Sequence, residues 1–104
     1  MNYKEYKLRD GYIIDLVKEI IEVEGMNTEN RTHDLAHRRY YLMYFLRRNT
    51  GLSLDAIGKL FNKHHATVIN ALRRHYEFIQ FADDFYLKNI EGIKEYLEGA
   101  LIQE

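Results

Sequence analysis

Residues 51–74 read GLSLDAIGKLFNKHHATVINALRR, and the apolar side chains in this segment recur at helical spacing. In the first half they recur every three or four residues, which predicts a short helix over 53–61. Ser53 stands just before this stripe, where its hydroxyl can accept from an unpaired backbone N–H as an N-cap. A second apolar stripe predicts a longer helix over 65–81. A short helix, a tight turn and a longer helix indicate a helix-turn-helix, whose second helix enters the DNA major groove.

The turn between these two helices supplies the polar side chains that would face DNA. Asn62 and Lys63 interrupt the apolar pattern, and asparagine is common in turns because it tolerates the left-handed conformation. Gly58, in the first helix, is expected to let the two helices approach closely. The side chains offered by the turn and the start of the second helix are those of Lys63, His64, His65, Ala66 and Thr67.

A longer motif lies within this region. Residues 57–68 read IGKLFNKHHATV, and Ala71 follows three positions later. This segment resembles the C-terminal duplex-binding domain of DnaA, the bacterial replication initiator, and the resemblance extends upstream through 38–54, RRYYLMYFLRRNTGLSL. It implies an all-α helix-turn-helix fold similar to that of the tryptophan repressor, and sequence-specific binding to double-stranded DNA.

The resemblance also implies roles for individual residues. Arg39 falls on a helix-borne arginine that contacts the DNA backbone, and Arg31 falls on one that reaches into the minor groove. Lys63, His65 and Thr67 fall on the basic, histidine and threonine positions of the recognition turn. The DNA-contacting residues expected in this chain are Arg31, Arg38, Arg39, Ser53, Leu54, Lys63, His64, His65, Ala66 and Thr67.

Three positions depart from the family pattern. His64 stands where the family commonly has aspartate, which accepts from the cytosine amino group, whereas an imidazole reads bases differently. Ala66 replaces a serine or threonine; it loses a hydroxyl but can pack on a thymine methyl group. Tyr40 replaces the glutamine that usually follows the backbone-contacting arginine. We therefore expect DNA binding with a target sequence that differs from the initiator's usual one.

The charge distribution favours a nucleic-acid interface although the net charge is −1. Residues 31–75 carry 9 basic and 2 acidic side chains, together with all five histidines. Residues 1–30 carry 4 basic and 7 acidic side chains, and residues 76–104 carry 2 and 7. A basic middle between acidic ends is expected where one face meets phosphate, and the simpler alternative is a set of solvated helix faces.

The rest of the chain predicts further helices, so we expect one helical domain over 1–104, a bundle of about five helices. The helix-turn-helix region is expected over 32–81, and the first and last helices are expected to flank the family core. The remaining predicted elements are a helix over 10–24, a loop over 26–32, a helix over 33–49 and a last helix over 84–98.

Several protein classes are disfavoured. There is no cysteine for a disulfide or thiolate site, no apolar run long enough to span a membrane, and no Gly-x-x-x-x-Gly-Lys stretch for an ATPase. His33 and His37 are spaced as in metalloprotease helices, but the intervening acid is aspartate and no third ligand follows. We therefore expect a cytoplasmic protein that is not an enzyme and carries no metal or cofactor.

The leading hypothesis is a sequence-specific double-stranded DNA-binding protein, acting in replication initiation or in transcriptional control of a mobile or chromosomal element. The alternative is a helical interaction module, in which the first and last helices form a homodimer or hold a protein partner and the DNA face is vestigial. A third reading is a small-ligand-responsive repressor, although nothing in the sequence marks a ligand pocket.

Overall fold

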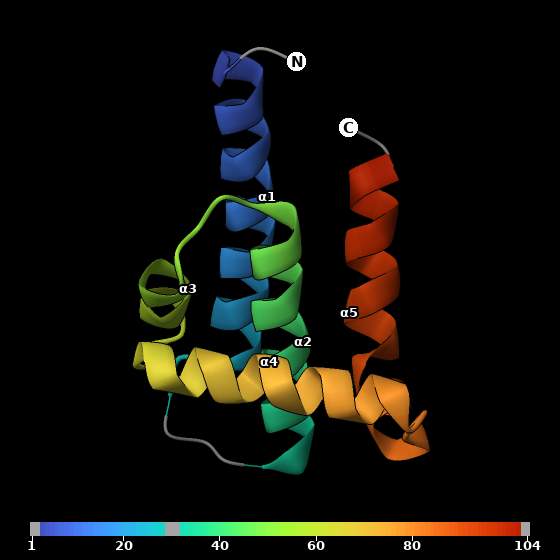
Figure 1. Cartoon of the computed structure of the whole chain (residues 1–104). Coiled ribbons are helices and arrows are strands. Elements are labelled where there is room, and N and C mark those ends of the chain that lie inside the picture. Colours follow the sequence, from blue (N-terminus) through green and yellow to red (C-terminus); the bar gives the residue numbers. More distant parts are fainter. Residues whose placement is uncertain (1–2, 29–31, 103–104) are drawn as a thin grey trace.

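The computed structural model describes residues 3–28 and 32–102, which form five helices and no strand (Figure 1). The all-α prediction is confirmed. The helices are α1 (Tyr3–Glu24), α2 (His33–Asn49), α3 (Leu54–Leu60), α4 (His65–Gln80) and α5 (Asp84–Ile102). The predicted bounds of the second helix match α2, whereas α1 begins seven positions before residue 10 and α5 continues beyond residue 98.

Helix α2 is the central element, because it contacts each of the other four helices. In Figure 1, α4 crosses the lower part of α2, and α3 lies at the N-terminal end of α4. Both chain ends lie at the same end of the molecule, opposite α4. The helix-turn-helix of α3 and α4 is therefore supported from behind by α2, while α5 extends away from the far end of α4.

The core is built around the middle of α2, which is buried on more than one side. Leu42, Phe45 and Leu46 are buried on one face of the helix, and Tyr41 and Met43 are buried as well because helices surround this segment. The buried apolar residues from the other elements are Ile13, Val17, Ile21, Met26, Ile57, Phe61, Val68, Ala71, Tyr86, Ile90 and Leu97.

Three of the helices end in the same way, with one residue in the left-handed conformation. Gly25 (φ 67°), Asn62 (φ 57°) and Ala82 (φ 48°) follow α1, α3 and α4. In each case the next backbone N–H donates to the carbonyl five positions earlier, at 2.8–3.0 Å, which is the Schellman arrangement. These positions agree with the predicted helix ends at residues 24 and 81 and with the turn predicted at Asn62.

The junction of α2, α4 and α5 holds two buried histidines. His75 lies in the basic middle of the sequence, yet it is buried, with its side chain 4 % exposed. Its Nδ1 lies 2.6 Å from the Tyr86 hydroxyl, and its ring stacks on Tyr44 at 4.0 Å between centroids. His37 is also buried, and its Nδ1 lies 2.8 Å from Nδ2 of Asn89. His75 therefore connects α4 to α5, and His37 connects α2 to α5.

Candidate nucleic-acid interface

The turn between α3 and α4 is held by a close approach of its own backbone to α3. The N–H of Lys63 donates to the Gly58 carbonyl at 2.8 Å. A Cβ on Gly58 would lie only 2.5 Å from the carbonyl oxygen of Lys63. Glycine is therefore required here, but the close approach is to the backbone of the turn and not, as expected, to the second helix.

Ser53 and Leu54 form the start of α3. The Ser53 hydroxyl accepts from the Ala56 N–H at 3.1 Å, so the predicted N-cap is confirmed. Leu54 is half-buried and packs against the core. The side chains of both residues thus have structural roles, and their contact with DNA stays a prediction.

His64 caps α4, a role that sequence reasoning missed. Its backbone is extended, and its Nδ1 accepts from the Ala66 N–H at 3.2 Å. The aspartate common at this family position is itself a preferred N-cap residue, which was the available signal. In this chain an imidazole nitrogen takes the place of a carboxylate oxygen as the cap.

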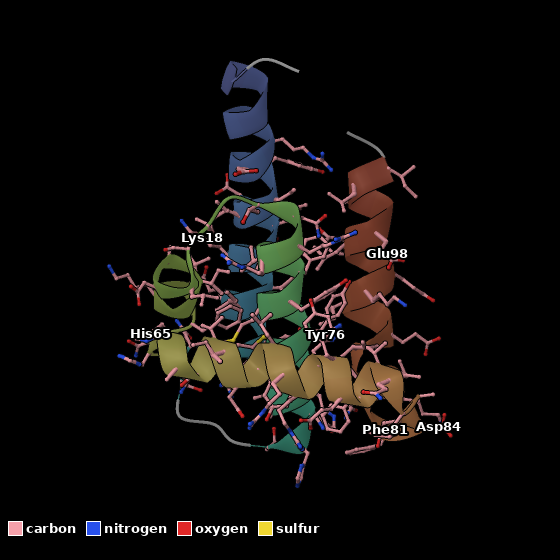
Figure 2. The ribbon with its side chains drawn as sticks, viewed as in Figure 1. Lys18, His65, Tyr76, Phe81, Asp84 and Glu98 are labelled. Atoms are coloured by element: carbon pink, nitrogen blue, oxygen red, sulfur yellow. The ribbon has the colours of Figure 1, made fainter. Side chains whose placement is uncertain are left out.

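His65 is the first residue of α4 and lies at the free end of that helix (Figure 2). Its Nδ1 lies 3.2 Å from Oδ1 of Asp55 in α3, so a side-chain contact bridges the two helices of the motif. The rings of His64 and His65 are 4.1 Å apart between centroids. Ala66 and Thr67 are exposed beside them, so four neighbouring residues at the start of α4 face solvent.

A groove of about 340 Å³ separates the start of α4 from the N-terminal half of α2. Lys63 and Thr67 line one side, and Arg39 and Tyr40 line the other. Lys63 is half-buried, and its Nζ donates to the Thr28 carbonyl at 3.3 Å. The recognition turn therefore lies beside the segment that precedes α2.

The arginines of α2 have partners within the protein. Arg39 is 7 % exposed and donates from Nε to the Met26 carbonyl at 2.7 Å and from Nη2 to the Thr28 carbonyl at 3.2 Å. This geometry departs from the expected exposed phosphate ligand, because burial directs the guanidinium to backbone carbonyls at the end of α1 and in the loop that follows. Arg31 lies outside the described residues.

Arg38 faces away from α4. Its Nε donates to the Asn89 carbonyl in α5 at 3.1 Å, and its Nη1 forms an ion pair with Glu24 in α1. The structure thus brings Lys63, His64, His65, Ala66 and Thr67 together at one end of α4, and it does not bring Arg38 to them.

The predicted histidine pair of α2 is not assembled as a metal centre. The rings of His33 and His37 are 6.3 Å apart between centroids, and Nδ1 of His37 is engaged by Asn89. Among the described residues, no three histidine or acidic side chains form a group that could hold a metal ion. Within the same part of the chain, no helix combines the length and apolarity needed to cross a membrane.

Comparison with known proteins gives the family of this interface. A family model for the bacterial DnaA protein helix-turn-helix matches residues 12–74. The chain belongs to this family. The match begins inside α1 and ends inside α4, so most of α1 is part of the DnaA segment rather than an addition to it, whereas α5 lies outside the match.

Curated relatives carry the name chromosomal replication initiator protein DnaA. The relative from Thermoanaerobacter sp. (strain X514) is 35% identical over 79 residues, which cover 76% of this chain and 18% of that protein. The one from Gloeobacter violaceus is 38% identical over 69 residues, covering 64% and 16%. The one from Thermosipho africanus is 27% identical over 105 residues, covering 95% and 24%. The chain thus spans less than a quarter of these DnaA proteins, and no solved structure matches it significantly.

Proposed function

We propose that this chain binds double-stranded DNA in a sequence-specific manner, with the first turn of α4 in the major groove. The observation that carries the proposal is the free end of α4, where His64, His65, Ala66 and Thr67 are exposed on a DnaA-type helix-turn-helix. These side chains stand on a rigid base, because the turn beneath them packs against Gly58 and the buried Phe61. A helix end held in this way, with two imidazoles, a methyl group and a hydroxyl exposed on it, is suited to reading base edges.

Lys63 and Arg39 support a second contact beside α4. Both donate to the same carbonyl, that of Thr28, and so hold Thr28 beside the recognition turn. Arg31 stands three positions after Thr28, in the segment of the sequence that precedes α2. We therefore propose that Arg39 acts mainly by positioning this segment, that Arg31 reaches the minor groove from it, and that Lys63 interacts with phosphate.

The role in the cell is also a proposal. The family and the names of the relatives favour replication initiation, and transcriptional control by the same DNA-reading unit is the alternative. We propose that the chain acts in the cytoplasm, by binding rather than by catalysis.

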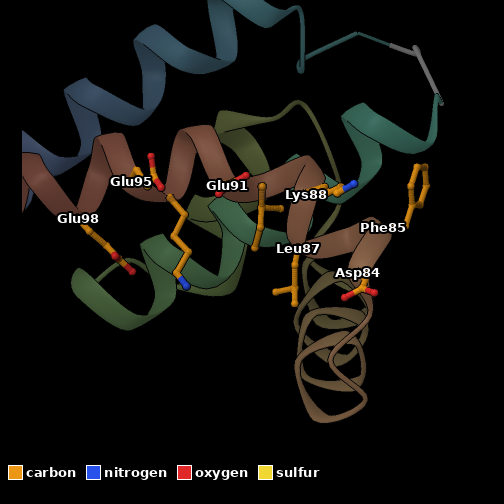
Figure 3. A pocket seen from close by; sticks show the side chains of 9 residues that line it. Asp84, Phe85, Leu87, Lys88, Glu91, Glu95 and Glu98 are labelled. Atoms are coloured by element: carbon orange, nitrogen blue, oxygen red, sulfur yellow. The ribbon is translucent and has the colours of Figure 1, made fainter.

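A second candidate function is supported by the far end of the molecule. Phe81 and Phe85 are exposed where α4 meets α5, and Tyr76 is exposed on α4 itself. Figure 2 labels Tyr76 and Phe81. A groove of about 750 Å³ runs along α5, and its lining combines four acidic residues with Lys88, Lys94 and apolar side chains that include Leu87 (Figure 3). Exposed aromatic side chains often mark protein interfaces. A homodimer or a complex with another protein through α5 would show as a mass above that of one chain in light scattering.

The dependence of binding on salt tests the main proposal. We expect the logarithm of the association constant for a duplex to fall with the logarithm of salt concentration at a slope of about −3 to −6, at about −0.9 per phosphate neutralised. Fluorescence anisotropy with a labelled duplex, over a series of salt concentrations, measures this slope. A slope near zero would show that basic side chains of α2, α3 and α4 do not meet the DNA backbone.

Two substitutions should separate phosphate contacts from base contacts. We expect Lys63→Ala to weaken binding to all duplexes alike and to reduce the salt slope by about 1. We expect Thr67→Ala to reduce the preference for the best site over other sites by about 1–3 kcal/mol, because a base contact is lost.

The matched control is Lys88→Ala, which removes a lysine from the exposed face of α5 (Figure 3). It should leave both affinity and preference close to those of the wild type. If Lys63→Ala and Thr67→Ala had the same effect on preferred and random duplexes, the proposed division of roles at the start of α4 would be wrong.

A further inference from the structure

The two adjacent histidines at the start of α4 have different partners for the same ring nitrogen. Nδ1 of His64 receives a hydrogen bond from the Ala66 N–H. A nitrogen that accepts a hydrogen bond carries no proton, so in the neutral ring of His64 the proton is on Nε2. Nε2 of His64 is therefore a donor.

His65 has the opposite arrangement. Its Nδ1 lies 3.2 Å from a carboxylate oxygen of Asp55, and an ionised carboxylate can only accept. This contact favours the ring form with the proton on Nδ1, which leaves Nε2 of the neutral ring as an acceptor. The two rings are 4.1 Å apart between centroids.

We propose that Asp55 is a specificity-determining positioning residue, which fixes the His65 tautomer so that the histidine pair offers DNA one donor and one acceptor. This inference rests on the proposed function, with the start of α4 in the major groove. The donor of His64 suits guanine O6 or N7, and the acceptor of His65 suits the amino group of cytosine or adenine. Asp55 thus helps select a base that it does not touch.

The exposure of the pair indicates that its role is orientation rather than stability. The Asp55 side chain is 73% exposed and that of His65 is 46% exposed. Ion pairs this accessible to water contribute little to folding, because solvent and salt screen them. A carboxylate oxygen 3.2 Å from Nδ1 still favours the ring form that carries its proton on that nitrogen.

The free protein provides the first test. At about pH 8, where an ordinary histidine is neutral, long-range ¹H–¹⁵N spectra distinguish protonated from unprotonated ring nitrogens. We expect the proton on Nδ1 of His65 and on Nε2 of His64 in the wild type. Asp55→Ala should convert His65 to a tautomer mixture and leave His64 unchanged, and Asp55→Glu should restore part of the Nδ1 proton. The matched control is Asp15→Ala, which removes the carboxylate of an exposed residue in α1. An unchanged His65 spectrum in Asp55→Ala would overturn the positioning role.

Selection from a pool of random duplexes provides the second test. We expect Asp55→Ala to lower the preference for an amino-bearing base at one position by about 5- to 100-fold, as for a lost base contact. Its affinity for random duplexes should not fall, because a negative charge is removed near the phosphates. A changed tautomer with an unchanged preference would overturn the specificity role. If the wild type bound no duplex, the proposed function and this specificity role would both fail, and the spectra of the free protein would still decide the positioning role.

Discussion

Gly58→Ala is expected to lower the free energy of unfolding by about 3 kcal/mol, because a close-packed backbone contact has no room for a methyl group. The new Cβ would lie 2.5 Å from the carbonyl oxygen of Lys63 and 3.4 Å from the carbonyl carbons of Lys63 and His64. These are backbone atoms, so no side-chain rotation relieves the clash. The turn itself must move, and the variant should also lose duplex binding.

Urea unfolding followed by circular dichroism measures this change, and α5 supplies the control. Gly92 lies inside α5, where a Cβ would meet no atom of the described residues within 4 Å beyond its own stretch of helix. Gly92→Ala should therefore stabilise the protein by about 0.5–1 kcal/mol, because alanine favours the helix more than glycine does. Similar unfolding midpoints for the two variants would contradict the close approach at Gly58.

Acidification from about pH 6.5 to pH 4 is expected to remove about 3 kcal/mol of stability through His75. Burial lowers the pKa of His75 from 6.5 to about 4, and the positive charge of Lys94 adds to this effect. Between these two pH values the unfolded chain binds a proton that the folded chain does not. The contribution of His75 is therefore complete above pH 6.5 and is lost as the pH falls toward 4.

His37 acts in the same direction. Its pKa is lowered by burial and by His33 and Arg74, while Asp34 and Asp83 oppose the shift. Both buried histidines bond to residues of α5, so we expect the α4–α5 junction to loosen on acidification.

Urea unfolding at a series of pH values tests this expectation, with two histidine variants compared. His75→Gln should lower stability at neutral pH and make it less dependent on pH. His33→Gln, which changes an exposed histidine, should alter the dependence much less, because it removes only one of the charges that lower the pKa of His37. A pH dependence that His75→Gln left unchanged would show that His75 does not remain neutral in the folded protein.

Much of the helix-turn-helix could be predicted from sequence because its signals are local. Apolar spacing gave α3 and α4 within one residue at each end. The cap at Ser53 and the left-handed residue Asn62 depend on atoms no more than a few positions away. The first helix was predicted less completely, because α1 begins at Tyr3 and the predicted helix began at residue 10.

The roles of polar side chains were harder to predict, because their partners are distant in the sequence. Arg38 bonds to Asn89, and His75 bonds to Tyr86, only once α5 has folded back against α2 and α4. The sequence identifies each of these residues as polar and helical, and it contains no local pattern that distinguishes a buried partner from an exposed ligand.

The sequence by itself therefore determined that this chain is a helical DnaA-type unit with an exposed turn at residues 62–67, because helix periodicity, caps and a long motif are properties of neighbouring residues. Only the tertiary structure decided that Arg39 is buried against backbone carbonyls and that Asp55 holds His65. The physical reason is that a hydrogen bond needs two groups about 3 Å apart, and the packing of the helices sets which groups meet.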